Sequence, residues 1–207
     1  MVFTDRTAVI YHHRTYTYRE LSMRVQSLAT VLINTYQIKQ GDRVAVICSN
    51  ILPNLEATYA IPAAGAIIVP VNTRLAAQEI EYIIQHSGAK VIILQRDFKD
   101  KITQSVANSV QIIDVADGSE TDPYEQLLMN CTSPVAWDKM PLLYDENATI
   151  SINYTSGSTG RPKGVMVTYR GVYLTALSMI IQCALSVNTV YLWTLPMFHC
   201  NGNCLIN

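Results

Sequence analysis

Short runs of β-branched residues alternate with amphipathic segments over the first 115 residues of the chain. The β-branched runs predict strands over residues 43–48, 67–71, 90–94 and 110–115. The segments between them predict helices over residues 54–64, 77–86 and, less regularly, 97–107. Strands separated by roughly 15 to 20 residues need crossover connections. The pattern therefore predicts an α/β fold with a mainly parallel sheet and helices on both faces.

The N-terminal residues predict a β-hairpin followed by a helix. Residues 8–11 and 16–18 favour strands, and His12, His13 and Arg14 form a polar tip between them. Neighbouring side chains of a strand point to opposite faces, so the two histidines are poorly placed to bind one metal ion. Thr17 and Glu20 match a helix capping box, and apolar positions follow at helical spacing: Leu21, Val25, Leu28 and Leu32.

Regular pattern is weakest over residues 114–145, where Asp, Gly and Pro are frequent and one short helix is expected over residues 124–129. A subdomain boundary is therefore predicted within residues 115–148. Strands are expected again over residues 149–153 and 165–168. The apolar stretch over residues 174–187 is shorter than the roughly 20 residues that cross a bilayer. It predicts a buried helix and no membrane span.

Composition excludes several classes of protein. Of the 207 residues, 49% are hydrophobic and 15% are charged, so a sizeable core is expected and a disordered chain is not. The net charge of -1 and the absence of a Lys/Arg cluster argue against nucleic-acid binding, which needs grouped cations. The five cysteines are odd in number and unevenly spaced, which suits packed thiols in a reducing compartment better than disulfides.

Residues 154–164 combine four Ser and Thr hydroxyl groups, three glycines and one lysine at the end of a predicted strand. Glycines let backbone N–H groups approach a ligand, hydroxyls donate to phosphate oxygens, and Lys163 supplies a positive charge. A flexible Gly/Ser/Thr linker is the alternative, but a linker gives no reason for Pro162 and Lys163 between two strands. The spacing does not match the Walker A, dinucleotide-binding or nucleophile-elbow patterns. A phosphate-binding loop is predicted.

Two motifs resemble those of a known family. Residues 154–164 (YTSGSTGRPKG) resemble the phosphate-binding signature of the AMP-forming acyl-CoA synthetases and related adenylate-forming enzymes. Residues 195–202 (LPMFHCNG) are similar to the motif of that family beside the acyl pocket. Weaker similarity covers nearly the whole chain and is greatest to plant-type acyl-activating enzymes, several of which are cytosolic or peroxisomal.

The resemblance implies an activity and a set of site residues. Family members join a carboxylic acid to ATP with Mg²⁺, release pyrophosphate, and pass the acyl group to CoA. By matching position, the β- and γ-phosphates would be held by Thr155, Ser156, Gly157, Ser158, Thr159, Gly160 and Lys163. His199 would face the reacting carboxylate and the α-phosphate. The implied partner is a small carboxylic acid, short-chain, medium-chain or aromatic, in the cytoplasm or peroxisome; no protein partner is implied.

The resemblance also implies an incomplete domain. The family's adenine, ribose and acidic Mg²⁺-binding residues and its C-terminal lid would follow Asn207, so residues 1–207 are expected to form part of an AMP-binding domain. Asn203 stands where plant members often carry Trp, which affects the wall of the acyl pocket. Two functions stay open: the N-terminal part of a ligase, or an inactive fragment that binds nucleotide weakly. His199, Cys200 and Cys204 lack a CxxC pair, and no resident metal site is predicted.

Overall fold

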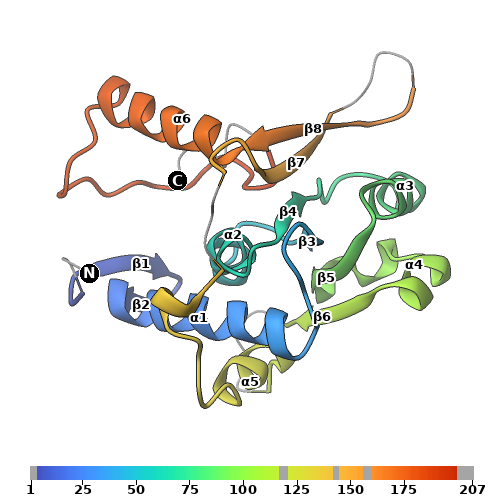
Figure 1. Ribbon diagram of the computed structural model, residues 1–207, viewed down its shortest axis with the longest axis horizontal. Helices are drawn as coiled ribbons and strands as arrows, with labels where there is room; N and C mark the ends of the chain where they lie inside the picture. The colour runs from blue at the N-terminus through green and yellow to red at the C-terminus, as the bar shows by residue number, and fades with distance from the viewer. Residues whose placement is uncertain (1–3, 117–120, 142–144, 156–159, 200–207) are drawn as a thin grey trace.

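The computed structural model describes residues 4–116, 121–141, 145–155 and 160–199. These residues form a two-stranded sheet, a six-stranded sheet and the helices that pack on them (Figure 1). Strand order in the larger sheet is β6-β5-β3-β4-β7-β8, and all neighbouring pairs are parallel except β7 with β8. The predicted α/β class with a mainly parallel sheet is confirmed.

The N-terminal hairpin and the first helix form as the sequence predicts. Strands β1 (Thr7–Tyr11) and β2 (Arg14–Thr17) pair antiparallel, with His12 at a positive φ of 53° in the turn. Helix α1 (Tyr18–Asn34) begins with the predicted capping box, in which the Thr17 hydroxyl accepts from the Glu20 amide. The Glu20 carboxylate in turn accepts from the Thr17 amide at 2.7 Å. This reciprocal pair satisfies two N–H groups that the helix cannot satisfy itself.

Four neighbouring parallel strands form the larger sheet from its β6 edge to β4. They are β3 (Arg43–Ile47), β4 (Ile67–Pro70), β5 (Ala89–Gln95) and β6 (Gln111–Val115). Each lies within one or two residues of its predicted range. Both faces of these strands are covered, which is why their sequences are continuous apolar runs instead of alternating ones.

Helices cover the two faces of the sheet. Helices α1, α2 (Leu52–Ala63) and α5 (Pro123–Met129) pack on one face, and α3 (Ala77–Ser87) and α4 (Gln104–Ser109) pack on the other (Figure 1). The 3₁₀ segments η1 (Arg96–Lys101) and η2 (Trp137–Lys139) lie in the connections. The single helix expected over residues 97–107 is divided, because Thr103 caps a new helix at the Val106 amide.

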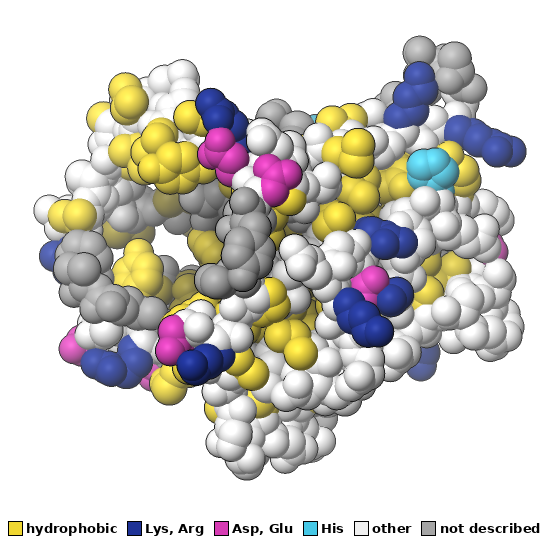
Figure 2. Space-filling view, in the orientation of Figure 1, with side chains coloured by type: hydrophobic (Ala, Val, Ile, Leu, Met, Phe, Trp, Pro, Cys, Tyr) yellow, Lys and Arg dark blue, Asp and Glu magenta, His cyan; other side chains and the backbone are white. Residues whose placement is uncertain are grey.

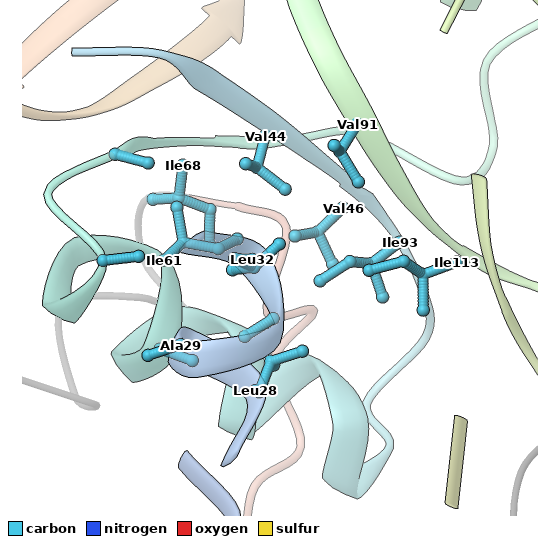
Figure 3. Packing of buried hydrophobic residues seen from close by; sticks show 14 of the residues in the cluster. Leu28, Ala29, Leu32, Val44, Val46, Ile61, Ile68, Val91, Ile93 and Ile113 are labelled. Atoms are coloured by element: carbon cyan, nitrogen blue, oxygen red, sulfur yellow. The ribbon is translucent and has the colours of Figure 1, made fainter. Parts of the chain in front are cut away.

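Alternate residues of each central strand supply two hydrophobic cores. Val44 and Val46 of β3 join Leu28, Leu32 and Ile61 in the core under α1 and α2 (Figure 3). Ala45 and Ile47 of the same strand pack on the opposite face against Ile80, Ile83 and Ile84 of α3. All of these side chains are at most 2% exposed. The cores fix α3 firmly on the sheet, which matters for the site below.

A buried ionic cluster joins α1, α2 and α5. The guanidinium of Arg24 pairs with the carboxylates of Glu56 and Glu125, and the hydroxyl of Tyr124 donates to Glu56 at 2.6 Å. Glu56 and Tyr124 are fully buried. Burial raises the pKa of Glu56, although Arg24 opposes the shift. Burial and the neighbouring Glu56 carboxylate together raise the pKa of Tyr124 well above its ordinary value.

The last part of the described chain is a hairpin followed by a helix. Strands β7 (Thr149–Thr155) and β8 (Lys163–Thr168) pair antiparallel, and β7 joins the sheet beside β4. Helix α6 (Tyr169–Gln182) follows directly, capped by the Thr168 side chain. None of the helices in the described ranges has the length and apolar character needed to span a bilayer.

The prediction of a buried helix over residues 174–187 is wrong in both extent and burial. The helix ends at Gln182, and Ala176 is the buried residue within it. Its large apolar side chains are exposed, with Ile181 at 79% and Leu174 at 53% (Figure 2). Apolar sequence alone cannot tell whether a covering surface is present in the same chain. The expectation of packed cysteines holds for Cys48 but not for Cys183, which is exposed.

Candidate functional site

The β7–β8 hairpin carries the residues predicted to bind phosphate. Thr155 is the last residue of β7, Lys163 is the first of β8, and the two are register partners across the hairpin. The chain between them forms the connection. Ser156, Gly157, Ser158 and Thr159 lie outside the described residues. The described part thus pairs Thr155 with Lys163 at the end of one hairpin, with Gly160 in the connection, and Lys and Arg side chains are visible there (Figure 2).

The two faces of the hairpin differ in chemistry. Ile152 and Tyr154 pack against the core on the α3 face of the sheet. Because side chains alternate along a strand, Ser151, Asn153 and Thr155 lie on the opposite face. Directly opposed residues of an antiparallel pair share a face, so Lys163 lies on the same side as Thr155. This arrangement gives one face with Ile152 and Tyr154 and an opposite face on which the polar groups lie beside Val165 and Val167.

An unsatisfied polar atom lies on this polar face. The Asn153 amide nitrogen donates to the Ser151 hydroxyl at 3.1 Å, whereas the buried Oδ1 of Asn153 has no hydrogen-bond partner within the described residues. A buried acceptor without a partner costs free energy unless a ligand or water supplies a donor. Sequence analysis did not identify Asn153. Its polar side chain at an inward-facing strand position was the available signal.

Gly160 has a backbone conformation that favours glycine. Its φ is +99°, and a Cβ built there would have no atom within 4 Å. The constraint at this position is therefore the dihedral angle alone, and the space around the backbone is open. A glycine backbone open to solvent lets main-chain groups approach an anionic ligand. Thr155 and Lys163 are also exposed, so all three described residues are accessible.

The predicted residue His199 lies on a separate segment. Asn50, which follows β3, holds that segment at two points: its amide nitrogen donates to the Leu195 carbonyl at 2.8 Å, and its Oδ1 accepts from the Met197 amide at 2.9 Å. Met197 is buried, while the exposed His199 closes a turn by donating its amide to the Pro196 carbonyl. Asn50 is a second residue that sequence analysis missed.

His199 and the hairpin lie at the same edge of the sheet. Asn50 and Thr155 both lie at the carboxyl ends of parallel strands. In the sheet β4 separates β3 from β7, a spacing of about 10 Å at the usual distance between strands. A ligand that reaches both groups therefore has to extend across two strands. A nucleotide triphosphate with a second substrate has that length.

The topological switch point of the sheet is closed. In open α/β sheets, ligands commonly bind where connections from adjacent strands leave toward opposite faces, here at the ends of β3 and β5. At that point the Gln95 side chain accepts from both the amide and the hydroxyl of Ser49, at 2.9 and 2.7 Å. These side chains satisfy each other.

The donor set suits phosphate more than a protein-bound metal. Within the described ranges no group of three or more His, Cys, Asp or Glu side chains is placed to hold a metal ion. Thr155 and Lys163 instead supply a hydroxyl and an ammonium group, which bind phosphate oxygens well. Mg²⁺ fits such a site through the phosphate oxygens of a nucleotide, because it is commonly held by substrate phosphates and few protein carboxylates.

Comparison with known protein families identifies the family to which the chain belongs. The profile of the AMP-binding enzyme family matches residues 2–207. The chain belongs to this family. The resemblance seen in residues 154–164 and 195–202 is thereby confirmed.

Individual members of the AMP-binding enzyme family are similar along nearly the whole chain. The peroxisomal benzoate–CoA ligase of Arabidopsis thaliana is 37% identical over 216 residues, and the probable peroxisomal acyl-activating enzyme 12 of the same plant is 36% identical over 216 residues. The alignments cover 97% of this chain and 37% of each relative. The chain thus spans little more than a third of the length of these relatives.

A solved structure of a family member is also similar. The O-succinylbenzoate coenzyme A synthetase of Bacillus subtilis, in complex with ATP and magnesium ion, superposes with a TM-score of 0.79 at 26% identity. That superposition covers 98% of this chain and 39% of the synthetase. The fold described above is therefore that of adenylate-forming enzymes, over part of their length.

Proposed function

We propose that this chain supplies the triphosphate-binding part of an AMP-forming acid–thiol ligase. In that reaction a carboxylate oxygen attacks the α-phosphorus of ATP and pyrophosphate leaves. The thiol sulfur of CoA then attacks the acyl carbon and AMP leaves. The observation that carries the proposal is the β7–β8 hairpin, which sets Lys163 opposite Thr155 on one polar face beside a glycine of positive φ.

The hairpin residues have separate tasks in this proposal. The Lys163 ammonium group and the Thr155 hydroxyl bind oxygens of the β- and γ-phosphates, with the backbone at Gly160 and residues 156–159 completing the loop. Bound Mg²⁺ would neutralise charge on the same phosphates. Stabilising phosphate charge and fixing geometry are the main sources of rate enhancement in such transfers. Asn153 Oδ1 is an acceptor on the same face, suited to a bound water or a ligand hydroxyl.

His199 is proposed to lie near the reacting carboxylate and the α-phosphate. Its segment is fixed by Asn50 at the same edge of the sheet as the hairpin, and its side chain is exposed. Support for the acid comes from the relatives: one is named for benzoate and the solved synthetase for O-succinylbenzoate. A small carboxylic acid, with aromatic acids tested first, is the proposed substrate, and CoA is the proposed thiol. A peroxisomal relative supports a peroxisomal location, with the cytoplasm as the alternative.

Residues 1–207 are proposed to be one partial AMP-binding domain, with a subdomain boundary within residues 115–148. The chain has 37% of the length of its relatives, and α6 exposes apolar side chains that a larger domain would cover. These two observations favour binding of nucleotide without turnover by residues 1–207 alone. Acyl-CoA synthesis is assigned to the protein that also contains the remaining family residues.

Calorimetric titration with MgATP tests the proposal. The chain is expected to bind MgATP, and Lys163→Ala is expected to weaken binding at least tenfold because it removes a charge from the phosphate site. Lys139→Ala, at an exposed lysine of η2, is the matched control and should bind as the parent chain does. Equal affinity of the Lys163→Ala variant would contradict the proposed site.

A thioester assay separates the two functions. The chain is incubated with ATP, Mg²⁺, CoA and benzoate, acetate or butyrate, and acyl-CoA is measured by chromatography. Binding of MgATP without acyl-CoA formation is the expected result. Acyl-CoA formed by residues 1–207 alone would show that the ligase function is complete in this chain. Absence of MgATP binding would overturn the proposed function as a whole.

A further inference from the structure

The apolar face of the hairpin has contacts that phosphate binding does not explain. Tyr154 directly precedes Thr155, and its hydroxyl oxygen lies 2.7 Å from Nδ1 of His86 on α3. The two rings meet edge to face, with centroids 5.8 Å apart at 85°. Residues 68 positions apart in the sequence are thus joined by one hydrogen bond at the base of the loop.

A second contact holds the other end of the loop to the same helix. The guanidinium carbon of Arg161 lies 5.8 Å from the ring centroid of Tyr82, within the range of a cation–π contact. Tyr82 and His86 are one helical turn apart on α3 and stack, with centroids 5.2 Å apart and planes at 27°. Tyr82 and His86 therefore contact the chain near both ends of the loop, at Tyr154 before it and at Arg161 in its last part.

Gly164 makes room for this arrangement. It is the register partner of Tyr154, and a Cβ at Gly164 would lie 2.8 Å from Cγ2 of Ile152 and 3.3 Å from Cζ of Tyr154. A side chain at Gly164 would force Ile152 to move and would crowd the Tyr154 ring. Burial raises the pKa of Tyr154, so its hydroxyl keeps its proton and can donate to His86.

Helix α3 is a rigid support at this end. Gly88 ends the helix in the left-handed conformation, and Arg43 of β3 donates to the carbonyls of Ser87 and Gly88 at 2.6 and 3.0 Å. These bonds satisfy two carbonyl groups at the C-terminus of the helix. His86 lies in this last turn, so its ring is carried by backbone that is tied to the central strand of the sheet.

We propose that His86 and Tyr82 are positioning residues that hold the ends of the β7–β8 connection and thereby set Thr155, Gly160 and Lys163 in their binding geometry. The identity of the ligand rests on the proposed function. The contacts of His86 with Tyr154 and of Tyr82 with Arg161, called the clamp below, are present without a ligand. Neither side chain touches phosphate, since Tyr154 lies on the face opposite to Thr155 and Lys163. Their effect is to restrict the conformations of the loop before the ligand binds, so that binding costs less conformational entropy.

The first test measures the local order of the hairpin in the absence of ligand. Hydrogen exchange of the amides of residues 160–168 is followed in the full chain, in His86→Ala, in Tyr154→Phe and in Gln85→Ala. Gln85 is adjacent to His86 but contacts Glu81 and Ser105, so it is the matched control. His86→Ala and Tyr154→Phe are expected to exchange at least tenfold faster, and Gln85→Ala at the parent rate. Unchanged exchange in both of the first two variants would overturn the clamp.

The second measurement uses Mg²⁺ with inorganic tripolyphosphate and then MgATP as probes. His86→Ala and Tyr82→Ala are expected to weaken both at least fivefold with little change in melting temperature, and His86→Gln to recover much of the loss through its amide. If the variants lose affinity only in proportion to a fall in melting temperature, and His86→Gln recovers none of the loss, the positioning role is overturned. If the parent chain binds neither probe while exchange still responds, the clamp stands and the proposed function fails.

Discussion

The chain has two regions whose burial differs sharply. The layered region, residues 7–140, packs β3 to β6 between helices on both faces, and its cores contain many side chains with no exposed surface. The hairpin region, residues 149–199, contains β7, β8 and α6, and most of its large apolar side chains are exposed. The same hydrophobic composition therefore leads to opposite surroundings in the two regions.

This difference separates the region expected to provide stability from the region proposed to bind phosphate. The layered region can fold around its own cores and supplies the rigid support of α3. The hairpin region supplies Thr155, Gly160 and Lys163 and depends on that support. We expect substitutions in the layered region to change the free energy of unfolding of the chain, and substitutions in the hairpin region to change local order and association.

The buried ionic cluster should give the largest effect among the variants that still fold. Glu56→Ala leaves Arg24 with one carboxylate and the Tyr124 hydroxyl without its acceptor. We expect the free energy of unfolding, measured by urea denaturation, to fall by about 3–5 kcal/mol. Arg170→Ala breaks the exposed pair with Glu146 in the hairpin region and should cost less than about 1 kcal/mol. Equal losses of unfolding free energy in Glu56→Ala and Arg170→Ala would contradict the proposed difference between the two regions.

The raised pKa of Tyr124 predicts how the free energy of unfolding changes at alkaline pH. Its folded-state pKa lies well above the ordinary value of 10.0, because burial and Glu56 disfavour the phenolate. A raised pKa contributes stability that is present below pH 10 and is lost as pH rises from there, at up to about 1.4 kcal/mol per pH unit. Tyr124→Phe should cost about 1–3 kcal/mol at neutral pH and remove this decline. Parallel curves for both proteins above pH 10 would contradict the prediction.

Two glycines of positive φ allow a direct comparison. A Cβ at Gly88 would lie 2.5 Å from Nη2 of Arg43, so Gly88→Ala should lower the free energy of unfolding by about 1–3 kcal/mol. Gly160→Ala has backbone strain but no clash. We expect it to raise hydrogen exchange within residues 160–168 while the unfolding midpoint of the layered region stays unchanged. A shift of that midpoint by Gly160→Ala would show that the regions unfold together.

Exposed positions of α6 should tolerate charge. Ile181→Lys places a cation at a side chain that is 79% exposed and should change the free energy of unfolding by less than about 0.5 kcal/mol. Ile83→Lys, at a position 1% exposed in α3, should prevent folding. Exposed apolar surface of this extent favours self-association, so sedimentation velocity should show less association for Ile181→Lys than for the parent chain. Equal self-association of Ile181→Lys and the parent chain would show that another surface causes the association.

Local patterns predicted most of the fold. The capping box at Thr17 and Glu20 and the β-branched runs of β3 to β6 depend on neighbours in sequence, and these elements form where expected. The exposure of α6 could not be predicted, because burial depends on which surfaces the chain provides elsewhere. The division of the 97–107 segment depends on one cap, at Thr103, whose contribution a helical pattern does not reveal.

The candidate site was only partly predictable. Residues 154–164 indicated phosphate because their chemistry is contained in one stretch of sequence, and Thr155 and Lys163 are paired at the end of one hairpin. Asn50 and His86 act through contacts with residues 145 and 68 positions away, at Leu195 and Tyr154. Such pairs arise from the fold, so a single sequence gives no local signal for them.

Arg43 has a consequence beyond the end of the helix that it caps. Its guanidinium connects the middle strand of the sheet to the turn of α3 that carries His86. A planar fork with several donors is needed to reach both carbonyls, and a lysine in its place could not reproduce that geometry. Under the proposed function, an inherited change at this distant position is expected to alter nucleotide affinity without touching the ligand, and a search limited to the residues of the loop would overlook it.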